Sequence, residues 1–169
     1  KRARFLAASA LALAFVGPAP LHAFTIENNP PADAAAAYRD LIPAAPDGAV
    51  TWEALEKTTV AVDANSKDGV AQPRFPDEIA ALDGKEVRVK GYIFPLDQSV
   101  RLSRFLLTAY PPDCPFCLPA GATQMIIVEC VRPLEFSMDA VVVAGRLQLQ
   151  KSSSDGLLYK MTGARFEKE

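Results

Sequence analysis

Apolar and polar side chains alternate along the chain from Glu86 onward, and this alternation constrains the fold more than any other feature of the sequence. In 86–94 and again in 140–150, apolar residues fall on one side and mainly charged or amide side chains on the other. A period of two is typical of a strand that buries one face. The side chains predicted to point into a core are Val87, Val89, Ile93, Val141, Val143, Leu147 and Leu149.

Five segments of this part of the chain are predicted to be strands, and no helical pattern separates them. They are 86–94, 101–110, 124–131, 140–150 and 157–167. Such a run predicts an antiparallel sheet. Gly91 and Gly145 fall inside two of the strands, where glycine usually marks a bulge or a tight bend. Strongly bent strands in this number suit a small closed barrel. We therefore expect a mainly β protein whose residues 76–169 form a five-stranded, OB-like antiparallel barrel.

The first 23 residues have the pattern of a cleavable secretory signal peptide. Lys1, Arg2 and Arg4 precede an apolar run over 5–16, and small and proline residues follow it. This run of about 12 residues is too short for a helix that must cross roughly 30 Å of hydrocarbon. We expect a periplasmic protein with no membrane span after cleavage of residues 1–23.

Residues 24–75 are rich in alanine and proline and are predicted to form a short helical or irregular N-terminal arm. One helical turn is expected after Thr51, which would cap it, with Trp52 and Leu55 on one face. The polar stretch 63–76, broken by glycine and proline, is predicted to be a linker. If 63–76 is a linker, the barrel domain should fold without the arm.

The residue inventory excludes several classes of function. The only histidine, His22, lies in the predicted signal peptide, so the mature chain has no Ser-His-Asp triad and no imidazole metal ligand. No HExxH, GxSxG, P-loop or GxGxxG motif is present. A length of 169 residues is that of one domain, and a net charge of −2 gives no basic field for nucleic acid. We expect a protein that is not an enzyme.

The chemically distinctive segment is 109–121, which joins the second and third predicted strands. It holds four prolines and places Cys114 and Cys117 three residues apart. In a secreted protein the two cysteines are expected to form a local disulfide if they bind nothing. A redox role would need a helix N-terminus to lower the first thiol's pKa, and Pro119 disfavours a helix there. Metal binding is the third alternative.

Soft thiolate ligands suit Cu(I) or Zn(II). Cys130 would be a third ligand beyond the Cys114–Cys117 pair, and Asp113 or a water a fourth. Two other roles for Cys130 remain open: a small buried side chain on the face of its strand, or a disulfide with one of the other two cysteines. The methionines are more typical of core packing than of thioether ligation. They are Met125, Met138 and Met161.

Several runs resemble an uncharacterised bacterial periplasmic family known as domain of unknown function 3299. They are 82–97, 105–111, the cysteine segment and 139–147, and the resemblance covers 50–167. It implies a secreted protein with an accessory or binding role. Some relatives are associated with periplasmic metal handling and with MacB-like ABC transporters.

This chain departs from the family at the cysteines. Many relatives carry a Cys-x-His pair followed by prolines, where this chain has a thiol at Cys117. The ligand set would become softer and shift toward Cu(I) or a thiolate zinc site. The expected function is a periplasmic metal-binding or transport-accessory protein, with a MacB-like ABC transporter or another envelope protein as partner. The alternatives are a thiol-disulfide redox protein and an interaction module with a structural disulfide.

Overall fold

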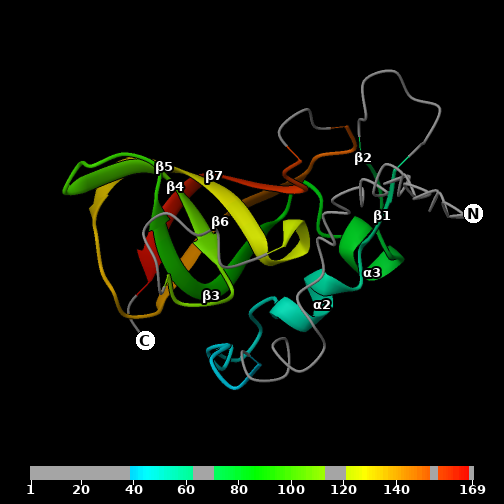
Figure 1. The fold of residues 1–169 in the computed structure, drawn as a ribbon, viewed down its shortest axis with the longest axis horizontal. Helices are drawn as coiled ribbons and strands as arrows, with labels where there is room; N and C mark the ends of the chain where they lie inside the picture. The colour runs from blue at the N-terminus through cyan, green and yellow to red at the C-terminus, as the bar shows by residue number, and fades with distance from the viewer. Residues whose placement is uncertain (1–38, 63–70, 113–120, 153–155, 168–169) are drawn as a thin grey trace, which may run out of the picture.

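The computed structural model describes residues 39–62, 71–112, 121–152 and 156–167 (Figure 1). The elements before the barrel are α2 (Trp52–Glu56), β1 (Thr59–Val62), β2 (Ala71–Arg74) and α3 (Asp77–Ala80). The barrel strands are β3 (Glu86–Pro95), β4 (Arg101–Thr108), β5 (Met125–Glu135), β6 (Val141–Leu149) and β7 (Tyr159–Glu167), with the 3-10 turn η1 (Ala122–Gln124) before β5. All five strands occur where alternation predicts them.

The five strands close into a barrel in the order β3-β4-β5-β7-β6, with β6 paired to β3. The prediction of a mainly β protein built on a small five-stranded barrel is confirmed. Four of the neighbouring pairs are antiparallel, but β5 and β7 are parallel. A closed ring with an odd number of strands cannot alternate in direction all the way round. At least one pair must therefore be parallel, and the sheet is mixed rather than wholly antiparallel.

The barrel interior is filled by the alternating side chains that the sequence indicates. Buried as expected are Val87, Val89, Ile93, Val143 and Leu147, while Val141 and Leu149 are partly buried against the same core. The neighbouring strands add Phe105, Leu107, Ile126 and Val128. Burial of this apolar surface is the main favourable term in the fold.

Helix α2 contributes two side chains to this core. It begins after Thr51, whose hydroxyl accepts a hydrogen bond from the Ala54 amide at 3.3 Å, as predicted. Trp52 and Leu55 are buried among the barrel residues, and the Trp52 indole nitrogen donates to the Lys90 carbonyl at 2.8 Å. The arm therefore supplies part of the core that we expected to be self-contained.

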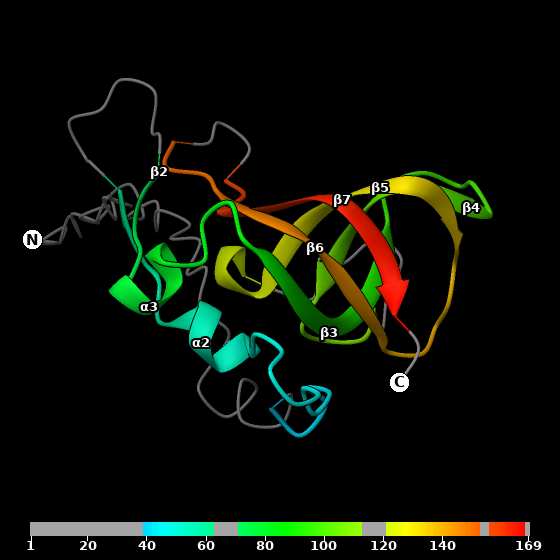
Figure 2. The same ribbon diagram turned by 180° about the vertical axis from the view of Figure 1, so that it is seen from behind.

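Further contacts join the arm to the barrel and give structure to part of the expected linker. The Val50 amide donates to the Arg88 carbonyl at 2.8 Å, and the Tyr92 hydroxyl donates to the Leu41 carbonyl. Within the expected linker, 71–74 is strand β2, which pairs antiparallel with β1. Residues 63–70 lie outside the described residues. Figures 1 and 2 show β1, β2 and α3 at one end of the barrel and the start of β4 at the other.

Gly91 marks the point at which β3 changes partner. The strand pairs with β6 up to Gly91 and with β4 from Tyr92. A Cβ on Gly91 would lie 2.7 Å from the Thr108 carbonyl oxygen and 3.0 Å from a ring carbon of Trp52. Only a residue without a side chain lets β3 bend here and lets the indole approach it. A Cβ on Gly145 would similarly meet Met161 at 2.7 Å.

The hydroxyl of Tyr159 connects the last strand to the arm. It donates to the Leu55 carbonyl at 2.8 Å and is also hydrogen-bonded to the Thr58 hydroxyl at 2.6 Å. Tyr159 and Thr58 are both buried. Burial raises the pKa of Tyr159 to about 12.

We predict that Trp52→Ala lowers the free energy of unfolding by about 3–5 kcal/mol, because it removes a large buried side chain and leaves a cavity. The partly exposed Val60 of β1 offers a control, and Val60→Ala should change the free energy by no more than about 0.5 kcal/mol. Urea unfolding followed by circular dichroism measures both. A loss below about 1 kcal/mol for Trp52→Ala would show that the arm adds little to the core.

The raised pKa of Tyr159 predicts that the folded protein loses stability at alkaline pH. Its pKa is about 12 in the folded chain, whereas an exposed tyrosine has an ordinary value of 10.0. The unfolded state therefore loses the proton first, and the free energy of unfolding falls as pH rises from about 10 toward 12. Tyr159→Phe should flatten this decline and lower stability at neutral pH by about 1–2 kcal/mol. Urea unfolding across this pH range measures the effect. If the free energy of unfolding falls just as steeply in the variant, other groups cause the fall.

Candidate functional site

The structure describes both ends of the cysteine segment, at 109–112 and at Gly121. The predicted ligands Cys114, Cys117 and Asp113 lie outside the described residues. Their role as ligands therefore stays a prediction from the sequence. The geometry of the two ends determines what the segment is attached to.

Backbone and side-chain hydrogen bonds hold these two ends together. The Ala109 amide donates to the Gln124 carbonyl at 3.1 Å. The buried Thr108 hydroxyl donates to the Tyr110 carbonyl at 2.8 Å. The Gly121 amide donates to the side-chain oxygen of Gln124 at 3.0 Å. The segment therefore leaves the barrel and returns to it at fixed, adjacent positions.

Gln124 links these ends to helix α2. Its side-chain nitrogen donates to the Tyr110 hydroxyl at 3.1 Å and to the Glu56 carboxylate at 2.8 Å. Burial, and then the nearby charge of Glu56, raise the pKa of Tyr110. We call Thr108, Tyr110, Gln124 and Glu56 the loop platform. Gln124 could not be predicted from the sequence, because one amide in a polar turn has no distinguishing pattern.

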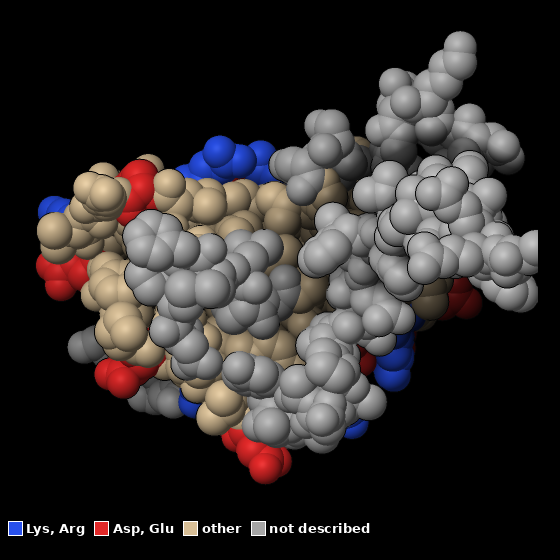
Figure 3. All heavy atoms as spheres, in the orientation of Figure 1, with Lys and Arg blue, Asp and Glu red and all other residues tan. Residues whose placement is uncertain are grey.

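A second apolar cluster lies beside the platform, on the outer side of β4 and β5. It consists of Leu106, Met125 and Ile127, with Phe94 and Leu157 packed against it. These residues alternate with the inward-facing ones, so they point away from the barrel interior. In Figure 3, which has the orientation of Figure 1, the described surface of the barrel is mostly uncharged, and its acidic and basic side chains lie mainly along the outline. Met125 follows η1 directly, so the cluster begins where the cysteine segment ends.

The three methionines differ in their burial. Met125 and Met161 are buried in apolar clusters, as core packing predicts, while Met138 is exposed.

Cys130 lies in β5, opposite Ala164 of β7, and is partly buried against the main core. Burial raises the pKa of its thiol to about 11. Metal ligation requires the thiolate, so this environment favours the interpretation of Cys130 as a packing residue. Within the described ranges, no group of three or more His, Cys, Asp or Glu side chains converges on a common point.

Comparison with known proteins identifies the family. The sequence profile of the family described as "Protein of unknown function (DUF3299)" matches residues 38–168. The chain belongs to the DUF3299 family. This confirms the resemblance seen in the sequence. A search of curated proteins gave no match.

A crystal structure of a DUF3299 family protein from Pseudomonas aeruginosa PAO1 is similar to this chain, at 26% sequence identity and a TM-score of 0.44. The similarity covers 53% of this chain and 65% of that chain. This chain therefore matches less than two thirds of the length of the solved protein.

In the part of the chain that the structure describes, no helix is both long and apolar enough to span a membrane.

The environment of Cys130 predicts slow alkylation. With a pKa of about 11 instead of its usual 9.0, the thiolate is about 100-fold scarcer at pH 8 than for an exposed cysteine. A variant with both Cys114→Ser and Cys117→Ser isolates this thiol. Its reaction with iodoacetamide should be slow when the protein is folded and reach the ordinary rate in urea. Equal rates in the two states would show that Cys130 is accessible and available as a ligand.

Proposed function

We propose that this DUF3299 protein is a periplasmic, non-enzymatic accessory protein that binds a soft metal ion through Cys114 and Cys117. The observation that supports the proposal best is the loop platform. It fixes both ends of the segment that carries the two thiols, by hydrogen bonds to Gln124. Fixed ends and flanking prolines reduce the conformational entropy that metal binding would otherwise remove.

The donor set favours Cu(I) over Zn(II). Structural zinc sites use four protein ligands, whereas soft thiolates select Cu(I). Cys130 is a weak third donor because its thiol is packed against the core and its pKa is raised. Asp113 remains as an oxygen donor beside Cys114 in the sequence. A pair of thiolates with at most one carboxylate suits Cu(I) best.

The redox alternative has less support from the described residues. A catalytic thiol is usually acidified at the N-terminus of a helix. The described helical element that follows Cys117 is η1, which has three residues and begins at Ala122. So short a turn has little dipole to stabilise a thiolate. The transport-accessory role, with a MacB-like ABC transporter or another envelope protein as partner, rests on the family resemblance.

The reduced protein should bind a single Cu(I) ion per chain, and the variant with both Cys114→Ser and Cys117→Ser should lose this stoichiometric binding. Cys130→Ser is the matched control and should bind as the unsubstituted protein does. Affinity should fall as pH decreases, because protons compete for the sulfurs. An anaerobic titration against a chromogenic Cu(I) chelator measures all three proteins, and Zn(II) is titrated in parallel.

Two results would contradict the proposal. The double serine variant could keep unchanged Cu(I) and Zn(II) affinity, which would place any metal elsewhere. Alternatively, alkylation of Cys114 could follow a pKa well below neutral, which would favour the redox alternative.

A further inference from the structure

The parallel strands β5 and β7 separate toward one end of the barrel and leave a groove between them. Their register runs from Ile127 opposite Lys160 to Cys130 opposite Ala164, with an irregularity after Val128. Among the described pairs none joins these two strands beyond that point. A hollow of about 430 Å³ lies there. We call it the seam groove; it is lined by Val131, Arg132, Leu134, Ala164, Arg165 and Phe166.

The β7 wall of the groove is paired with β6 on its far side, whereas the β5 wall bulges before it pairs with β4 again at Leu134. On one wall, Leu134 of β5 is opposite Leu102 of β4. On the other wall, Phe166 of β7 is opposite Val143 of β6. Figure 2 shows β7 turning away from the end of β5. Beyond Ala164 the β7 strand is therefore paired on one side only, and its open edge faces the groove, where an added strand can pair with it.

The groove continues into an apolar surface at the same end of the barrel. Leu134 and Phe166 are partly buried at its base, while Val131 is 73% exposed. The Phe136 amide donates to the Val100 carbonyl and so joins the end of β5 to the β3–β4 turn. Most exposed large hydrophobic side chains of the described residues lie here: Leu96, Val100, Val131, Phe136 and Met138. Such a concentration is typical of a binding surface.

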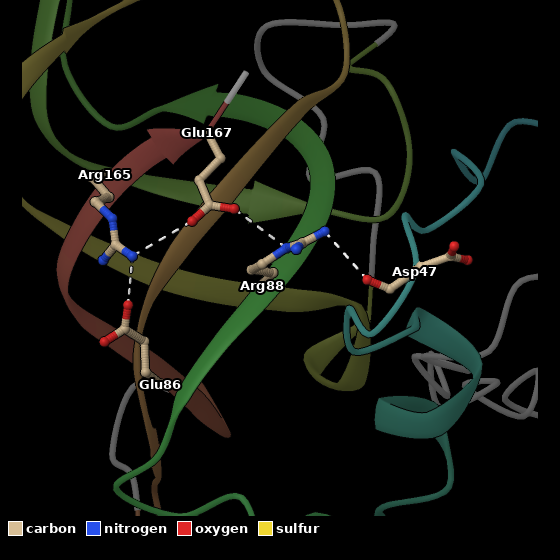
Figure 4. Close-up of polar contacts among 5 residues, drawn as sticks. All are labelled: Asp47, Glu86, Arg88, Arg165 and Glu167. Carbon is tan, nitrogen blue, oxygen red and sulfur yellow. Dashed lines mark hydrogen bonds and ion pairs between the residues drawn. The ribbon is translucent and has the colours of Figure 1, made fainter. Parts of the chain in front are cut away.

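The two arginines of the groove differ in their partners. The Arg165 guanidinium is held by Glu86 and Glu167, and Glu167 also pairs with Arg88 (Figure 4). Arg132, in contrast, has no carboxylate partner among the residues that the structure describes. The groove thus presents one uncompensated positive charge beside an apolar floor.

We propose that the seam groove binds an extended, apolar segment of another protein by strand addition, with a carboxylate of that segment paired to Arg132. Strand addition uses main-chain hydrogen bonds for affinity and alternate side chains for specificity, and an apolar floor with one cation selects for apolar residues and an acid. A protein segment suits this end better than an anionic lipid surface, because Asp97, Glu135 and Asp139 lie on the same turns and strand end. The groove lies toward the end of β5, whereas the cysteine segment rejoins the barrel before the start of β5, so we expect peptide binding not to need the two thiols.

The probe is a short, capped, fluorescent peptide of valine and threonine with one central glutamate, titrated into the full chain. Binding is followed by anisotropy and located by amide chemical shifts. We expect the shifts to fall on the amides of 131–132, 134–135 and 164–167, since residue 133 is a proline and has no amide proton. Arg132→Gln should weaken binding about tenfold, through loss of one charge-assisted contact. Arg146→Gln, at an exposed arginine of β6 outside the groove, is the matched control and should have no effect.

Two further comparisons test the mode of binding. A peptide N-methylated at alternate residues keeps its side chains but cannot pair along one edge, so its binding should be lost. Val131→Asn changes an exposed side chain and should weaken binding without altering thermal stability. The variant with both Cys114→Ser and Cys117→Ser should bind the peptide normally, which separates this site from the metal proposal.

The proposal is overturned if the unmethylated peptide does not bind, or if the methylated peptide binds equally well. It is also overturned if sedimentation shows a dimer that Val131→Asn dissociates, since the occupant would then be a second copy of this chain. Binding of anionic lipid vesicles that Arg132→Gln abolishes, without peptide binding, would assign the surface to a membrane.

Discussion

A closed ring of five strands must contain a parallel pair, and the rest of this structure depends on where that pair lies. Because β7 pairs antiparallel with β6, it runs parallel to β5. The other neighbours alternate in direction, so the whole departure from an antiparallel sheet is concentrated between β5 and β7. There the register is irregular and ends at Cys130, and the groove opens beyond it. The groove thus lies toward the C-terminal ends of β5 and β7, and helix α2 is bonded near their N-terminal ends.

The end that receives the helix is closed by groups distant in sequence. Trp52 reaches the Lys90 carbonyl because Gly91 has no side chain, and Tyr159 holds the carbonyl at the end of the same helix. The loop platform extends this arrangement, since Gln124 bonds Glu56 of that helix as well as Tyr110. The cysteine segment is thus attached where helix α2 meets the barrel. Its attachment is a property of the fold, whatever the thiols bind.

Local pattern was sufficient to predict the strands, the Thr51 cap and the two glycine bends, because each depends on neighbouring residues alone. The docking of Trp52 could not be predicted, since a short helix with two apolar residues looks the same whether or not it enters a core. The parallel pair follows from the odd number of strands once closure is assumed, whereas the strand pattern alone predicts an antiparallel sheet. No local sequence pattern marks Gln124 or Arg132. Gln124 matters because distant segments meet at it, and Arg132 because two strands separate beside it.

The bonds from Tyr159 to Leu55 and Thr58 join residues 104 and 101 positions apart. Contacts of such long range form late, since the chain between them must first be ordered. The helix that carries Leu55 therefore gains its bonds to Tyr159 only after the last strand has been made. For a chain exported unfolded, as a periplasmic protein would be, this topology delays folding until translocation is nearly complete. Until β7 has been made, these bonds are missing and the barrel stays open, which is the state that export of an unfolded chain would require.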